Sequence, residues 1–119
     1  MKRSESRRCV RLAEEIRREL AEVLENEIQD PRLAWVTLSG ARLNSDLKIA
    51  EIFYTMSGDQ QRQSEAKAGL EAAKGYLRSA LGRRLRMKAL PELRFRFDDY
   101  LEEMIYGQPG FHDSGTDQD

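Results

Sequence analysis

The sequence predicts one small α+β domain, with helices covering one face of a three-stranded sheet. Apolar residues recur every three or four positions in two long segments, which is the period of a helix. They alternate with polar residues in three short segments, which is the period of a strand. Glycine, proline and short polar runs separate these segments. The predicted order is α-β-β-α-α-β, and we expect the domain to occupy residues 1–106.

The first helical segment follows Ser6, a residue type that caps helices by accepting a hydrogen bond from a backbone amide. We expect the helix to end at Asp30-Pro31, because a residue before proline is excluded from the α region. The apolar residues of its predicted buried face are Val10, Ala13, Ile16, Leu20, Val23, Leu24 and Ile28.

Residues 36–43 and 48–56 show the alternation of strands and predict a β-hairpin. Asn44, Ser45 and Asp46 lie between them, and their short polar side chains favour a turn. We therefore assign Ser45 and Asp46 to the turn rather than to catalysis. Trp35 precedes the first strand, and its position is compatible with an exposed anchor or with a lid over the core.

A second helical pattern begins after residues 57–59 and continues to about Lys88. Gly75 lies inside this pattern, and glycine costs about 1 kcal/mol relative to alanine in a helix interior. The glycine predicts a kink that divides the segment into two helices.

The third predicted strand follows Pro91, where apolar and charged residues alternate again. Its Phe95 and Phe97 share one face of the strand. We expect both rings to pack under the helices rather than to serve as exposed platforms for RNA bases.

The net charge of −1 conceals two segments of opposite sign. All 20 Lys and Arg residues lie at or before Arg96, alongside 14 of the 21 acids, so residues 1–97 carry about +6. The other seven acids follow Phe97 with no base among them, which gives residues 98–119 about −7. Glycine, proline and acids dominate residues 107–119, and this composition predicts a disordered tail.

Fifteen of the 20 bases lie in two segments, from Lys2 to Arg18 and from Lys74 to Arg96. At about 100° per residue, Arg7, Arg11 and Arg18 lie opposite the apolar face of the first helix. A charged stripe usually only solvates a helix, but clustering of this density is typical of phosphate contacts. The candidate RNA-binding residues are Arg7, Arg8, Arg11, Arg18, Lys67, Lys74, Arg78, Arg83, Arg84, Arg86 and Lys88.

The sequence shows no residue set for catalysis, a cofactor or a metal ion. Cys9 is the only cysteine, and His112, the only histidine, has no second metal ligand at a suitable spacing. Asp98 and Asp99 are adjacent, so their side chains are expected on opposite faces of the strand end. There is no Walker A or other glycine-rich phosphate-binding motif. We therefore expect a protein that is not an enzyme and that holds no cofactor or metal.

The chain also lacks an apolar run of 18 residues and the apolar segment of a signal peptide. We expect a cytoplasmic, monomeric protein that contacts no membrane.

Four spaced motifs occur in order along the chain: Asp30-Pro31-Arg32-Leu33, Ser45-Asp46-Leu47, Ala73-Lys74-Gly75 and Pro91-Glu92-Leu93. Together they resemble the motifs of the ribosome-binding factor A family, the bacterial assembly factors of the small ribosomal subunit. Residues 5–99 carry the resemblance, which implies a type II KH-like domain with a kink between its second and third helices. It also implies that Ala73 and Gly75 form this kink and replace the G-x-x-G loop with which KH domains hold four nucleotides.

The resemblance implies binding to the free small (30S) subunit or its precursor, with 16S rRNA and ribosomal proteins as candidate contacts. It further implies support for late maturation and for processing of the 5′ end of precursor 16S rRNA. One alternative is a protein-interaction module that uses the sheet and Trp35 without direct RNA contact. Another is an RNA-processing enzyme, for which no acid-base or metal set is visible. The acidic tail matches no family motif, and it either repels RNA or has no role.

Overall fold

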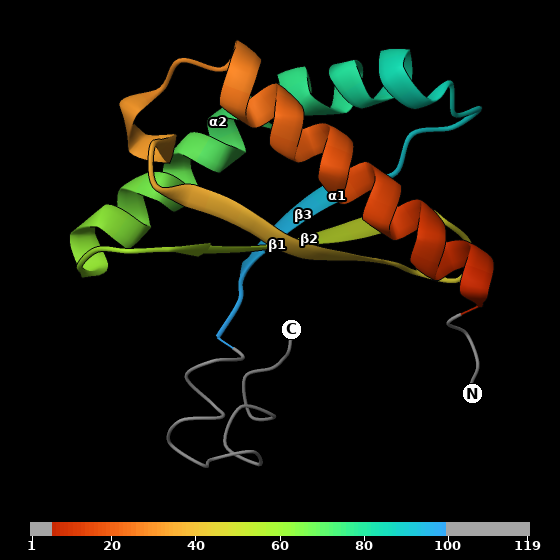
Figure 1. Cartoon of the computed structure of the whole chain (residues 1–119), viewed down its shortest axis with the longest axis horizontal. Coiled ribbons are helices and arrows are strands. Elements are labelled where there is room, and N and C mark those ends of the chain that lie inside the picture. The colour runs from red at the N-terminus through yellow and green to blue at the C-terminus, as the bar shows by residue number, and fades with distance from the viewer. Residues whose placement is uncertain (1–5, 100–119) are drawn as a thin grey trace.

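A computed structural model describes residues 6–99 and contains two helices above a three-stranded sheet (Figure 1). Both helices cover the same face of the sheet, so the predicted α+β class is confirmed. The ends of the predicted domain and the predicted tail over residues 107–119 lie outside the described residues. The elements are α1 (Arg7–Glu27), the short 3-10 helix η1 (Pro31–Leu33), β1 (Val36–Leu43), β2 (Ile49–Met56), α2 (Gln60–Leu85) and β3 (Glu92–Phe97).

The sheet has the order β1-β2-β3. Strands β1 and β2 form the predicted antiparallel hairpin, with a register shift between Leu38 and Gly40. Strands β2 and β3 are parallel, and parallel strands need a crossover connection, which α2 supplies. Strand β2 is central in the sheet. Its successive side chains point to opposite faces, so one set faces the helices and the other faces away.

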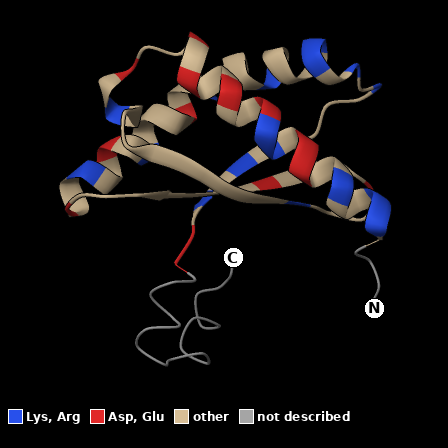
Figure 2. Cartoon of the chain, viewed as in Figure 1, with Lys and Arg blue, Asp and Glu red and all other residues tan. Residues whose placement is uncertain are grey.

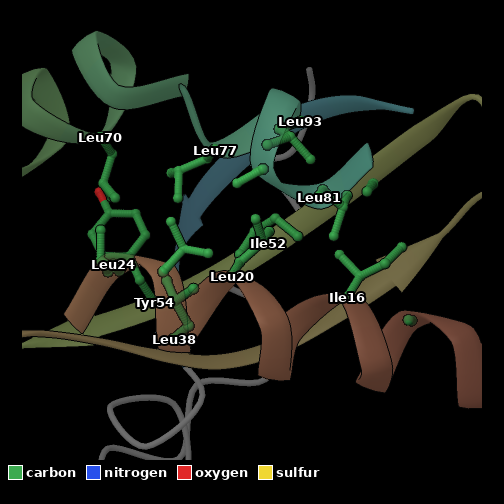
Figure 3. Close-up of a cluster of buried hydrophobic side chains, with 14 of the residues drawn as sticks. Ile16, Leu20, Leu24, Leu38, Ile52, Tyr54, Leu70, Leu77, Leu81 and Leu93 are labelled. Carbon is green, nitrogen blue, oxygen red and sulfur yellow. The ribbon is translucent and has the colours of Figure 1, made fainter. Parts of the chain in front are cut away.

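The hydrophobic core lies between the helices and the sheet (Figure 3). Leu20 of α1, Leu77 of α2 and Ile52 of β2 are fully buried, and the first two lie on the periodic apolar faces that the sequence indicates. Each such side chain contributes about 1.5–3 kcal/mol by leaving water. The packing therefore holds both helices in one orientation over the sheet.

Local side chains set the helix starts, as the sequence predicts. The Ser6 hydroxyl accepts a hydrogen bond from the Cys9 amide, 3.1 Å away, at the beginning of α1. Asp59 accepts one from the Arg62 amide, 2.9 Å away, at the beginning of α2. At the other end of α2, Arg86 has a left-handed backbone with φ of 53°, which ends the helix.

The predicted division of the second helical segment at Gly75 is wrong, because α2 is one helix from Gln60 to Leu85. Its ribbon changes direction in the middle part but does not break (Figure 1). The buried Leu70 and Leu77 anchor the helix on both sides of the glycine, and this packing offsets the propensity cost. Neither Ala73 nor Gly75 forms a loop.

Two aromatic residues, Phe97 and Trp35, are exposed rather than packed in the core. Phe95 packs against the core as expected, but Phe97 is 38% exposed, so the prediction that the helices cover it is wrong. Phe97 ends an edge strand, and its ring meets Tyr54 edge-on with 5.7 Å between ring centroids. Trp35 is 61% exposed, which makes it a surface residue and not a lid over the core.

Candidate nucleic-acid interface

Residues 7–18 of α1 include four exposed arginines that form no salt bridge with a carboxylate among residues 6–99. The start of the helix also carries the positive end of the helix dipole, which favours anions. Arg7, Arg11 and Arg18 lie opposite the apolar face that packs on β1, and Arg8 lies on the side of the helix. We call this group the α1 basic surface, and it consists of Arg7, Arg8, Arg11 and Arg18.

Arg17 differs from its neighbours because protein groups already hold it. Its guanidinium lies 2.6 Å from the Glu14 carboxylate and donates to the Leu38 carbonyl of β1. The hydrogen bond from Arg17 lowers the pKa of Glu14. Arg17 therefore joins α1 to the sheet, whereas the α1 basic surface points to solvent.

A second group of exposed bases lies at the end of α2 and in the residues that follow it. The α2 basic end consists of Arg83, Arg86 and Lys88, none of which forms a salt bridge with a carboxylate in the described part of the chain. Figure 2 shows the start of α1 and the end of α2 toward the same side of the molecule. The fold thus brings the two basic segments of the sequence to one end of the helical layer.

Arg84 is also in this segment, but it points toward α1. Its guanidinium pairs with Glu19 at 2.8 Å, with Glu22, and with Glu27 at 3.1 Å. Hydrogen bonds to these carboxylates, first to Glu19, raise the pKa of Arg84. The Tyr76 hydroxyl donates to Glu27 over 2.6 Å, and this bond is the main cause of the lowered pKa of Glu27. The cluster links the two helices and compensates the charge of Arg84.

Two further candidates have partners within the protein. Arg78 donates from Nε to the Pro91 carbonyl at 3.0 Å and from Nη2 to the Leu90 carbonyl at 2.9 Å. It thereby holds the connection between α2 and β3. Lys74 pairs with Glu71 at 2.8 Å, while Lys67 is exposed. Of the three candidates in this part of α2, Arg78 and Lys74 are therefore already engaged within the protein.

The outer face of the sheet, away from the helices, carries arginines that the sequence-based candidate set leaves out. Arg96 and Arg42 lie 2.7 Å and 3.3 Å from the Glu51 carboxylate, and Arg94 pairs with Glu92 at 3.1 Å. The alternation of these bases with core residues along the strands could have located them on this face. Their charges are compensated locally, in contrast to the α1 basic surface.

Trp35 stands in the chain between Ala34 and Val36, which line a hollow between α1 and β1. Leu24 and Ile28 line this hollow as well, together with polar residues that include Arg17, Glu25 and Asp30. Exposed aromatic residues are enriched at protein contact sites.

Within residues 6–99, no group of three or more His, Cys, Asp or Glu residues is arranged to hold a metal ion. In the same range, neither helix has both the length and the apolar character to cross a membrane. Asp98 accepts a hydrogen bond from the Ser39 hydroxyl at 2.7 Å, and His112 lies outside the described residues.

Comparison with known proteins places this geometry in a family. A family model described as ribosome-binding factor A matches residues 8–107. The ribosome-binding factor A of Thioalkalivibrio sulfidiphilus is 41% identical over 96 residues, which cover 81% of this chain and 74% of that protein.

Two structures have the same fold. The crystal structure of ribosome-binding factor A from Thermus thermophilus matches with a TM-score of 0.66 and 31% identity, covering 74% of this chain and 93% of that chain. A homology model of the Thermus thermophilus factor, as fitted into a cryo-EM map of a 30S complex, matches with a TM-score of 0.64 and 30% identity. The match covers 76% of this chain and 96% of that chain. The resemblance carried by the sequence motifs is confirmed, and the chain belongs to the ribosome-binding factor A family.

Proposed function

We propose that this protein binds the free small ribosomal subunit or its precursor, and that the α1 basic surface and the α2 basic end contact 16S rRNA. The observation that carries this proposal is the group of seven bases, at one end of the helical layer, that form no salt bridge with a carboxylate in residues 6–99. Phosphates would supply the missing counter-charge and release bound cations on binding. The fitted 30S complex of the Thermus relative supports the choice of target.

The candidate residues divide into two roles under this proposal. The α1 basic surface, the α2 basic end and the exposed Lys67 contact phosphates directly. Arg84 and Arg78 position these groups, because Arg84 joins α2 to α1 and Arg78 holds the chain after α2. Lys74 contacts RNA only after it exchanges Glu71 for a phosphate.

The continuous helix α2 also bears on the mode of RNA recognition. Residues 60–85 are helical throughout, so there is no G-x-x-G loop at Gly75 to hold four unpaired nucleotides. Side chains on the helix surface suit the phosphate backbone of structured RNA. The protein therefore recognises a folded region of rRNA by the placement of its phosphates.

The proposed cellular role is support of late small-subunit maturation in the cytoplasm, including processing of the 5′ end of precursor 16S rRNA. The protein acts as a monomer and stabilises an rRNA conformation, while separate nucleases cleave the RNA. Membership of the ribosome-binding factor A family supports this role. Ribosomal proteins near the rRNA site are secondary partners.

Co-sedimentation with purified small subunits tests the proposal. The wild-type protein should sediment with free 30S subunits and not with translating ribosomes, and the binding should weaken steeply with salt. Replacement of Arg7, Arg11 and Arg18 by Gln should lower the affinity more than about tenfold, since each lost phosphate contact reduces the electrostatic free energy of binding.

The matched control replaces Arg42, Arg94 and Arg96 on the outer sheet face by Gln, which makes the same change in net charge. It should lower the affinity much less, because local carboxylates already compensate these arginines. Equal losses from the two triple variants would show that the α1 basic surface is not the contact.

A second candidate function is a protein-interaction module, and the exposed Trp35, whose chain neighbours line the hollow between α1 and β1, favours it. Such a module would stay bound to subunit proteins after RNase treatment, whereas rRNA-dependent binding would be lost. Under this alternative, Trp35→Ala would release the protein and the triple arginine variant would not.

A further inference from the structure

The residues that follow β3 in the sequence are acidic. At the end of β3, the Asp98 amide donates to the Tyr54 carbonyl at 2.7 Å, and the Asp98 carboxylate accepts from Ser39. These contacts fix the point from which residues 100–119 continue. The acids of this segment, which contains no Lys or Arg, are Glu102, Glu103, Asp113, Asp117 and Asp119.

The described part of the chain offers two basic areas to such a segment. On the outer sheet face, Glu51 and Glu92 already compensate the arginines. The α1 basic surface and the α2 basic end form no salt bridge with a carboxylate in residues 6–99. Charge complementarity therefore favours the helical surfaces over the nearer sheet face.

The length of the segment allows this contact. Nine residues separate Lys88, the last residue of the α2 basic end, from the exit point at Asp98. Six of them form β3, which is about 20 Å long. Twenty residues span up to about 66 Å when extended. A covalent tether of this length also holds its acids at a local concentration in the millimolar range, which makes weak ionic contacts effective.

We propose that residues 100–119 bind in cis to the α1 basic surface and the α2 basic end, and that rRNA displaces them. The segment carries five charges in 20 residues, whereas RNA carries about one charge per nucleotide. A folded rRNA site with many phosphates outcompetes the segment, but short or poorly matched polyanions do not. The segment thus reduces nonspecific binding more than specific binding.

The contact itself is measured by NMR on the full chain. The test variant carries Glu102→Gln, Glu103→Gln, Asp113→Asn, Asp117→Asn and Asp119→Asn. Compared with wild type at low salt, its amide shifts should change at residues 7–18 and 83–88, and the difference should disappear at high salt. No shift difference, or differences at the outer sheet face around Arg42 and Arg96, would overturn the proposal.

The consequence is measured as affinity for poly(U) and for purified small subunits. The variant should bind poly(U) about tenfold more tightly than wild type, with a much smaller gain for the subunit. A matched control replaces three exposed glutamates that form no salt bridge in residues 6–99, Glu15, Glu25 and Glu65, by Gln. It is compared with a variant of the same net charge that carries Asp113→Asn, Asp117→Asn and Asp119→Asn.

An equal gain in poly(U) affinity for the control would mean that only net charge matters, and would overturn docking in cis. The poly(U) and subunit measurements rest on the proposed function, but the NMR measurement needs no RNA. Shift differences at residues 7–18 in a protein that fails to bind small subunits would leave the cis contact standing and refute the proposed function.

Discussion

Nη1 of Arg84 in α2 lies 2.8 Å from Oε1 of Glu19 in α1, and this contact joins residues 65 positions apart in the chain. Glu22 and Glu27 complete a set of three carboxylates around the same guanidinium. A base that the sequence assigns to RNA contact is thereby turned toward the neighbouring helix. The adjacent Arg83 forms no salt bridge with a carboxylate in the described chain. Of these two neighbouring arginines, Arg84 therefore has a structural role and Arg83 is available for binding.

Arg84→Gln should lower the melting temperature by about 3 °C, because three carboxylates would lose their shared counter-charge. Arg83→Gln is the matched control, and it should change the melting temperature much less. Differential scanning calorimetry at low salt measures both. Equal melting temperatures for wild type and Arg84→Gln would show that the cluster adds no stability.

Combined Arg83→Gln and Lys88→Gln substitutions in the α2 basic end should weaken 30S binding. The slope of log affinity against log salt should fall by about 2, since two phosphate contacts are lost. The fold should be unaffected, as both side chains are exposed. A filter-binding salt titration gives the slope, and an unchanged slope would exclude these residues from the interface.

Arg78→Ala should reduce the free energy of unfolding by about 1–3 kcal/mol, because the carbonyls of Leu90 and Pro91 lose a charged donor. Charge reversal at Arg78 should therefore destabilise the domain as well as affect binding. Urea denaturation measures the change. Arg78→Lys keeps one donor and should recover part of the loss; full stability of Arg78→Ala would show that these hydrogen bonds do not stabilise the fold.

Two of the three glycines in α2, Gly69 and Gly75, should respond to alanine with opposite signs. At Gly75 an added Cβ has nothing within 4 Å, so Gly75→Ala should stabilise the helix by up to about 1 kcal/mol. At Gly69 the same Cβ would lie 3.0 Å from Leu33 Cδ2, so Gly69→Ala should be destabilising unless that side chain moves. Thermal unfolding of both variants checks the contrast, and destabilisation by Gly75→Ala would show that the bend in α2 requires glycine.

Acid should weaken the link between α1 and α2. The Tyr76 hydroxyl and Arg84 hold the pKa of Glu27 below its ordinary value of 4.5. A lowered folded-state pKa stabilises the fold above the unfolded value, and this stability is lost as pH falls below about 4.5. The melting temperature of Glu27→Gln should accordingly vary less with pH between 5 and 3 than that of wild type. If the melting temperatures of Glu27→Gln and wild type changed equally with pH, Glu27 would not be the cause of the acid sensitivity.

Local chemistry in the sequence was enough to predict most elements of the fold. Ser6 starts α1 and the β1 strand occupies residues 36–43 as expected, because caps, turns and periodicity depend on near neighbours in the chain. Gly75 shows the limit of this reasoning. Its propensity cost is local, but the packing of Leu70 and Leu77 that offsets it involves the other elements of the fold.

For the candidate site, the sequence by itself determined the family, the helical positions of the bases and the separation of basic and acidic segments. Only the tertiary structure decided which bases are compensated. Arg84 and Arg78 find partners on α1 and before β3, whereas Arg7 and Arg83 form no salt bridge with a carboxylate in residues 6–99. The physical reason is that a charge is compensated by groups a few ångströms away in space, and packing of α2 against α1 and β3 brings those groups together from distant parts of the chain.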